Sequence, residues 1–152
     1  MIDVTLKIDI ARPRETVAAY AMEAENDPAW IGGISSAQRL TPPPTGVGTR
    51  VERVASFRGK RIEYVMDVID HVPGRKIVLK TVKGPFPMEV TYAFEDRDRG
   101  TRAFIRVAGD TKGFYRLAAP LLVRGVKRNV GRDLKRLKKA LESGIQGPRT
   151  AG

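Results

Sequence analysis

Cysteine is absent from this chain of 152 residues, and histidine and tryptophan occur once each. Without thiols the chain can form neither a disulfide framework nor a thiolate metal site. The single histidine, His71, precedes the turn at 72–74 and is interpreted as a surface residue. Gly32 and Gly33 lack the strand–glycine–helix setting of a phosphate-binding loop. We therefore expect neither a metal nor another cofactor.

Long apolar runs are also missing. The longest uncharged apolar stretch, 117–123, is interrupted by Pro120, whereas a membrane-spanning helix needs about 20 residues. The first residues include Asp3 and Lys7 in place of a basic segment followed by an apolar one, so no signal peptide is expected. We predict a cytoplasmic protein.

Positive charge is in excess, and it is unevenly distributed. The chain has a formal net charge of +11. Residues 111–152 contain eleven Lys or Arg against two acidic residues, whereas residues 1–110 carry seventeen basic and fifteen acidic side chains. An electrostatic partner would therefore bind near the end of the chain.

The first 110 residues read as one strand, two short helices and about six more strands. Residues 2–10 alternate between apolar and polar side chains, which indicates a half-buried strand. Asp27 is interpreted as the cap of the second short helix. Turn motifs divide residues 34–107 into short predicted strands, and the polar run 96–100 is predicted to be a hairpin loop. Connections this short require antiparallel neighbours.

The remaining segment is predicted to be one long amphipathic helix. Apolar residues recur there every three or four positions, at Val123, Val126, Val130, Leu134, Leu137 and Leu141. We expect a single domain over 1–143 and a flexible tail over 144–152. The predicted class is α+β: a curved antiparallel sheet of about seven strands whose apolar face must be covered by the long helix.

Several short motifs, in this order, resemble the polyketide cyclase/dehydrase-like SRPBCC proteins of the START/Bet v 1-like superfamily, which have the helix-grip fold. The resemblance covers roughly residues 2–143. Its motifs are 11–17 (ARPRETV), 27–30 (DPAW), 59–61 (GKR), 84–87 (GPFP) with Tyr92, Phe94 and Glu95, 100–102 (GTR), 113–117 (GFYRL) and 120–122 (PLL).

The resemblance implies an apolar cavity between the sheet and the last helix. Its mouth would lie between residues 57–61, 84–87 and 113–117. The candidate lining residues are Tyr64, Met66, Met88, Val90, Tyr92, Phe94, Ile105, Phe114, Leu117 and Leu121. The alternative is that these side chains fill an ordinary core.

Arg53, Tyr64 and Tyr92 are the candidate catalytic residues. Arg53 shares its side of a predicted strand with Val51, so its guanidinium is placed among apolar neighbours. Pointing inward beside two phenols, it could bind a carboxylate or polarise a carbonyl during cyclisation or dehydration. The alternative places Arg53 and the tyrosine hydroxyls at the surface.

The leading functional hypothesis is binding or carriage of a small hydrophobic ligand, such as a lipid, isoprenoid, quinone or aromatic polyketide. A cyclase or dehydratase using the same cavity is the alternative. A third reading is surface interaction through the basic helix, by transient contact with an anionic membrane through Lys127, Arg128, Arg132, Lys135 and Lys139. No aromatic side chain interleaves with these charges, so nucleic acid is disfavoured. The protein is expected to be a monomer or a homodimer.

Overall fold

A computed structural model describes residues 2–57, 59–84, 87–109 and 119–143. Its elements follow the predicted order. They are β1 (Ile2–Ile10), α1 (Arg14–Met22), the 3-10 turn η1 (Ala24–Asn26), α2 (Asp27–Trp30), β2 (Ile34–Arg39), β3 (Arg50–Phe57), β4 (Lys60–Val72), β5 (Lys76–Lys83), β6 (Glu89–Arg97), β7 (Gly100–Gly109) and α4 (Ala119–Glu142).

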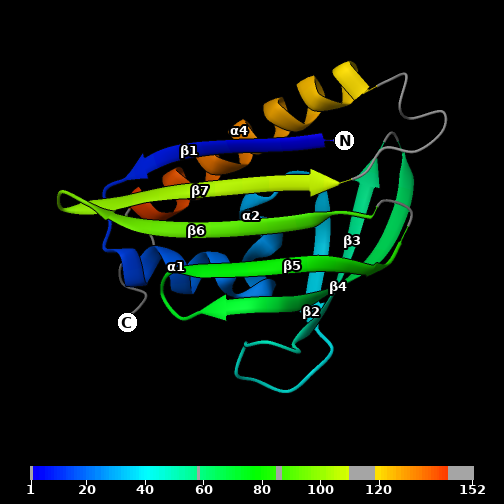
Figure 1. The fold of residues 1–152 in the computed structure, drawn as a ribbon, viewed down its shortest axis with the longest axis horizontal. Helices are drawn as coiled ribbons and strands as arrows, with labels where there is room; N and C mark the ends of the chain where they lie inside the picture. Colours follow the sequence, from blue (N-terminus) through cyan, green and yellow to red (C-terminus); the bar gives the residue numbers. More distant parts are fainter. Residues whose placement is uncertain (1, 58, 85–86, 110–118, 144–152) are drawn as a thin grey trace.

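The seven strands form one antiparallel sheet in the order β1-β7-β6-β5-β4-β3-β2. Strands β2 to β7 are sequential neighbours, as their short connections require. Strand β1 pairs with β7 instead, so the first strand lies beside the last (Figure 1). The curled sheet with its long last helix confirms the predicted helix-grip class.

The β6–β7 connection is tighter than the sequence suggested. The predicted hairpin is present, but its loop is shorter than 96–100, because β6 continues through Arg97, and Arg97 pairs with Gly100 at the start of β7. Two residues remain for the turn, and Asp98 adopts a φ of 52° there. Aspartate is among the few residue types that tolerate this left-handed region, so the hairpin closes without glycine at that position.

Helix α4 lies across β1 and beside α2, on the side of the sheet that α1 and α2 also occupy (Figure 1). Its second half buries Val130, Leu134, Leu137 and Leu141. Hydrogen bonds also hold this part of the helix to the end of β1 and the residues after it. Lys138 Nζ donates to the Asp9 carbonyl at 2.8 Å, and Arg12 Nε donates to the Leu141 carbonyl at 2.7 Å. The helix is therefore anchored toward its C-terminal end. None of the described helices is long and apolar enough to cross a bilayer.

The predicted cap at Asp27 is wrong. Asn26 occupies the N-cap position of α2, no side chain caps that helix, and Asp27 is its first residue. The Asp27 residue is 2% exposed. Its carboxylate therefore lies in the core, where it requires a partner of opposite charge.

Candidate functional site

The concave face of the sheet is closed near α1. The inward side chains from there along the sheet are Met66, Val90, Tyr92, Phe94 and Ile105, and each is 6% exposed or less. All five were predicted to line a cavity, and the structure places them together in the main apolar cluster. Over these five residues the concave face forms a packed core.

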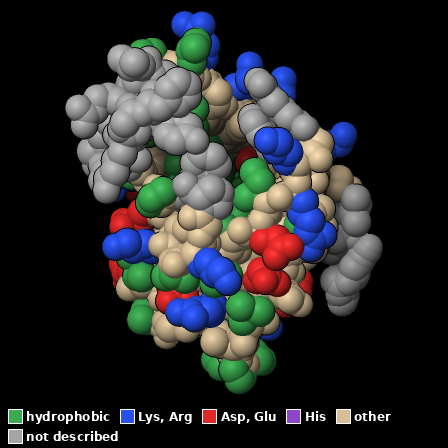
Figure 2. Space-filling model, turned by 90° about the vertical axis from the view of Figure 1, so that its right-hand side faces the viewer, with side chains coloured by type: hydrophobic (Ala, Val, Ile, Leu, Met, Phe, Trp, Pro, Cys, Tyr) green, Lys and Arg blue, Asp and Glu red, His purple; other side chains and the backbone are tan. Residues whose placement is uncertain are grey.

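The opposite end of the concave face is less covered. Tyr64, Met88, Val107 and Val126 are only partly buried against the same cluster. Figure 1 places the start of α4, the start of β6 and the β3–β4 hairpin together at this end. Figure 2 looks onto it and shows hydrophobic side chains recessed in a hollow. An apolar chamber between sheet and helix would open at this end.

The first half of α4 is also less buried than the second. Val123 and Val126 continue the apolar stripe of the helix, yet both are half-buried, whereas Leu134 and Leu137 are fully buried. Leu121 is 68% exposed. Two further predicted lining residues, Phe114 and Leu117, lie outside the described residues.

A buried polar cluster joins β3, α2 and β6 within the core. Arg53, 4% exposed, points inward from β3, and its Nε donates to Asp27 Oδ2 at 2.9 Å. Its Nη2 donates to the Tyr92 hydroxyl at 3.1 Å, and its Nη1 lies 3.5 Å from the Met66 sulfur. The structure thus joins Arg53 with Tyr92, as predicted. Tyr64 is the cross-strand neighbour of Arg53, but no hydrogen bond joins these two side chains.

Burial sets the protonation of this cluster. It raises the pKa of the Asp27 carboxyl above its usual value, although Arg53 limits the rise. Burial alone would lower the pKa of Arg53, but interactions with Tyr92 and Asp27 outweigh it and hold that pKa well above its usual value. Burial raises the pKa of Tyr92 to about 12. Tyr92 is therefore a neutral phenol at neutral pH, and because its oxygen accepts from Arg53, its own hydrogen is free to donate.

The enclosed space beside this cluster is small. A cavity of about 10 Å³ has Asp27, Arg53 and Tyr92 in its walls, which is room for about one water molecule. A larger ligand has no space next to Arg53 in this conformation. The half-buried residues at the open end are better placed to contact one.

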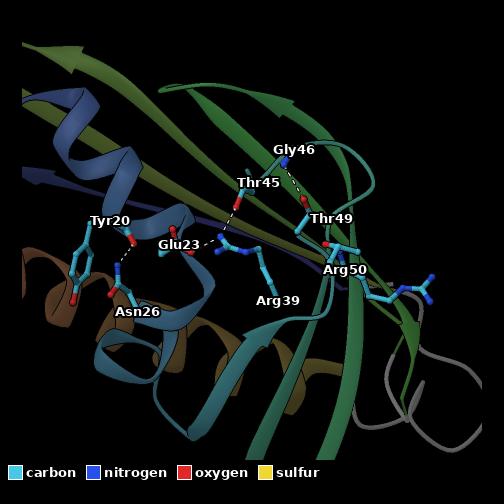
Figure 3. A network of polar contacts seen from close by, with 9 residues as sticks. Tyr20, Glu23, Asn26, Arg39, Thr45, Gly46, Thr49 and Arg50 are labelled. Carbon is cyan, nitrogen blue, oxygen red and sulfur yellow. Dashed lines mark hydrogen bonds and ion pairs between the residues drawn. The ribbon is translucent and has the colours of Figure 1, made fainter. Parts of the chain in front are cut away.

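An outer groove lies on the far side of this small cavity. It has a volume of about 680 Å³ and is lined by α1, the loop at 43–45 and the β4–β5 turn, including His71. Met22, Arg39 and Thr45 line both spaces. Figure 3 shows Arg39 Nη1 donating to Glu23 Oε1 at 2.6 Å and to Thr45 Oγ1 at 3.2 Å. Arg39 therefore separates the groove from the core. No cluster of metal-ligating side chains surrounds His71 or any other described residue.

Sequence reasoning missed two members of the polar cluster. Asp27 supplies the counter-charge of Arg53, and Trp30 packs edge-on against Tyr92 with ring centroids 5.5 Å apart. A signal was available, because an arginine predicted to point inward needs a buried carboxylate, and Asp27 stands three residues before the only tryptophan of the sequence. Asp27 was instead assigned to helix capping.

The fold and the site define a helix-grip domain with an apolar concave face. The family model described as "Polyketide cyclase / dehydrase and lipid transport" matches residues 1–142, and the chain belongs to this family. No curated protein matches the chain.

Solved structures agree on the fold. The Zhui aromatase/cyclase from Streptomyces sp. R1128 is 15% identical, with a TM-score of 0.74 and 94% of each chain covered. Protein NE0264 from Nitrosomonas europaea is 17% identical, with a TM-score of 0.75, covering 95% of this chain and 97% of that one. The di-domain ARO/CYC StfQ from the steffimycin biosynthetic pathway is 19% identical, with a TM-score of 0.79, covering 96% of this chain and 52% of that one.

Proposed function

We propose that the protein binds a small apolar ligand between the open end of the concave face and the first half of α4. The observation that carries the proposal is a change in burial along one apolar surface. Met66 and Phe94 are fully buried, whereas Tyr64, Met88 and Val126 are only partly buried. Half-buried apolar side chains facing one another gain free energy when a ligand removes them from water, by about 25 cal/mol per Å². Membership of a family described by cyclase and lipid-transport activities supports the same conclusion.

The ligand class is a lipid, an isoprenoid, a quinone or an aromatic polyketide. Its apolar part would contact the open end, and the Tyr64 hydroxyl, half-buried beside it, could orient a polar group. Of the predicted lining residues, Tyr64, Met88, Phe114 and Leu117 are the proposed contacts. Met66, Val90, Tyr92, Phe94 and Ile105 are packed in the core, and Leu121 is 68% exposed, so these six are not among them.

Polar substitutions at the open end should weaken ligand binding. Met88→Gln and Val126→Gln each place an amide where an apolar side chain would meet the ligand, and each should lower affinity about tenfold. The measurement is titration with the fluorescent apolar probe N-phenylnaphthylamine. Ile69→Gln is the matched control, because Ile69 is apolar but 45% exposed on β4.

The proposal fails if the wild-type protein neither binds the probe nor carries a small molecule in native mass spectrometry after mild purification. It also fails if Ile69→Gln weakens binding as much as the two substitutions at the open end. Either result would mean that the chamber does not admit a ligand.

An enzyme is the second candidate, favoured by the Tyr92 hydroxyl. Arg53 donates to the oxygen of this hydroxyl, which polarises the O–H bond. In a conformation whose core opens to admit a substrate beside Arg53, this hydroxyl would be a better donor to a carbonyl in a cyclisation or dehydration. Tyr92→Phe removes only that hydroxyl. In an enzyme it should lower turnover of an aromatic polyketide substrate by 10²-fold or more with little change in probe affinity. Unchanged turnover would exclude Tyr92 as the donor.

A further inference from the structure

The outward face of α4 carries a row of cations without acidic partners. The row consists of Arg124, Arg128, Arg132, Lys135 and Lys139, spaced three or four residues apart and all exposed. The two acidic residues of α4 are already paired, Asp133 with Arg136 and Glu142 with Lys138. None of the five cations of this outer row forms an ion pair or hydrogen bond with another described residue.

Arginines on the sheet are arranged differently. Four arginines of β3, β4 and β7 that reach the surface have acidic partners within 3.0 Å on their own or a neighbouring strand: Arg50 with Asp67, Arg61 with Glu63, Arg102 with Asp9 and Arg106 with Asp3. Charge on that surface is therefore largely balanced locally. The net positive charge of the described chain is concentrated on α4, which has eight Lys or Arg against two acidic residues.

Packing holds this face toward solvent. The opposite side of α4 buries Val130, Leu134 and Leu137, and its last turns are bonded to the β1–α1 connection. The helix cannot roll without exposing this core. From Arg124 to Lys139 the row extends for about 22 Å, at about 1.5 Å per residue. At the N-terminal end of the same face lies Leu121, 68% exposed.

We propose that the outer row docks the protein on an anionic lipid bilayer, with Leu121 entering the headgroup region. Docking brings the open end of the concave face, which lies beside the start of α4, close to the lipid. Cations give an electrostatic attraction and the exposed leucine a hydrophobic one. A nucleic acid would use the charges alone, since the segment 124–139 contains no aromatic side chain to stack on a base. The inference extends the proposed function by naming the source of the ligand.

Vesicle sedimentation tests the docking. The wild-type chain should bind phosphatidylcholine vesicles that contain phosphatidylglycerol, bind pure phosphatidylcholine weakly, and lose affinity as salt is raised. The triple variant Arg128→Gln, Arg132→Gln, Lys135→Gln should bind the anionic vesicles about a hundredfold more weakly, since each cation near such a surface contributes about a factor of five. Leu121→Asn should weaken the binding that remains at high salt.

The matched control removes the same charge from elsewhere. Lys7→Gln, Lys80→Gln, Arg99→Gln neutralises three exposed cations outside α4 and should leave vesicle binding within about threefold of wild type if position, not net charge, matters. Equal losses in both triple variants would overturn the proposal, as would tighter binding to duplex DNA than to anionic vesicles at the same salt.

Probe binding without vesicles separates the two proposals. If N-phenylnaphthylamine binds but vesicles do not, the docking inference is wrong and the ligand-binding proposal stands. If vesicles bind and the probe does not, the docking inference stands and the ligand-binding proposal is wrong.

Discussion

Arg53→Met should destabilise the protein by about 3–5 kcal/mol, since it leaves the Asp27 carboxylate buried without a partner. Both side chains of this pair are nearly inaccessible, at 4% and 3% exposure, so water cannot replace the lost guanidinium. Methionine keeps most of the side-chain volume, and the effect therefore reports charge more than packing. Urea unfolding followed by far-UV circular dichroism measures it.

A second substitution should reverse much of this loss. In Arg53→Met combined with Asp27→Leu, no buried charge remains, and such replacements are often neutral or stabilising. Arg61→Met is the surface control: Arg61 and Glu63 are 69% and 56% exposed, and exposed pairs contribute about 0–1 kcal/mol. A loss below 1 kcal/mol in Arg53→Met would show that the pair is not buried in solution.

The stability of Arg53→Met should also depend on pH in a defined direction. Burial raises the pKa of Asp27 in the folded protein even beside Arg53, and without Arg53 nothing opposes that rise. Between the unfolded and folded pKa values the folded state binds more protons, so its stability falls as pH increases. The variant should therefore recover stability from neutral pH toward mildly acidic pH, relative to wild type. An equal pH dependence in the two proteins would contradict this assignment.

Trp30→Ala should cost about 3–5 kcal/mol, the usual range for deleting a large buried aromatic side chain. Trp30 is 1% exposed and packs on the Tyr92 ring beside the Arg53 cluster. Because it is the only tryptophan, unfolding has to be followed by circular dichroism in place of fluorescence.

Trp30→Phe distinguishes packing from hydrogen bonding at the same position. The Trp30 indole N–H is buried and has no acceptor among the described residues, so removing it sacrifices no hydrogen bond. Phenylalanine keeps a ring against Tyr92, and the cost should be well under half that of Trp30→Ala. Equal costs would mean that the indole N–H has an acceptor in solution.

Periodic patterns made most of the fold predictable. The alternation over Ile2–Ile10 gave a strand with those bounds, and short turns forced antiparallel neighbours. The side that Arg53 shares with Val51 made an inward arginine one of two alternatives, and in the structure Arg53 is 4% exposed. These predictions succeed because the period of a strand is local and needs no knowledge of distant partners.

Distant partners explain what was missed. Asp27 is 26 residues from Arg53 in the sequence. An aspartate before a proline at the start of a helix is typical of an N-cap, and the local sequence does not show which distant side chain it contacts. Val126 and Leu134 belong to the same stripe of α4, yet only Leu134 is fully buried. Spacing shows which side of a helix faces the sheet, but not where along its length the two surfaces separate. That separation is what the proposed ligand site depends on.

The place of β1 in the sheet also determines when the domain can form. Strand β1 leaves the ribosome first, but its hydrogen-bonding partner β7 comes about ninety residues later, and the helix that covers it later still. Until residue 142 has been synthesised, the apolar side of β1 has no native surface to pack against. During translation the apolar side of β1 therefore stays exposed to solvent or bound by a chaperone. The last step of folding pairs β1 with β7 and packs α4 on it, which joins the two ends of the domain.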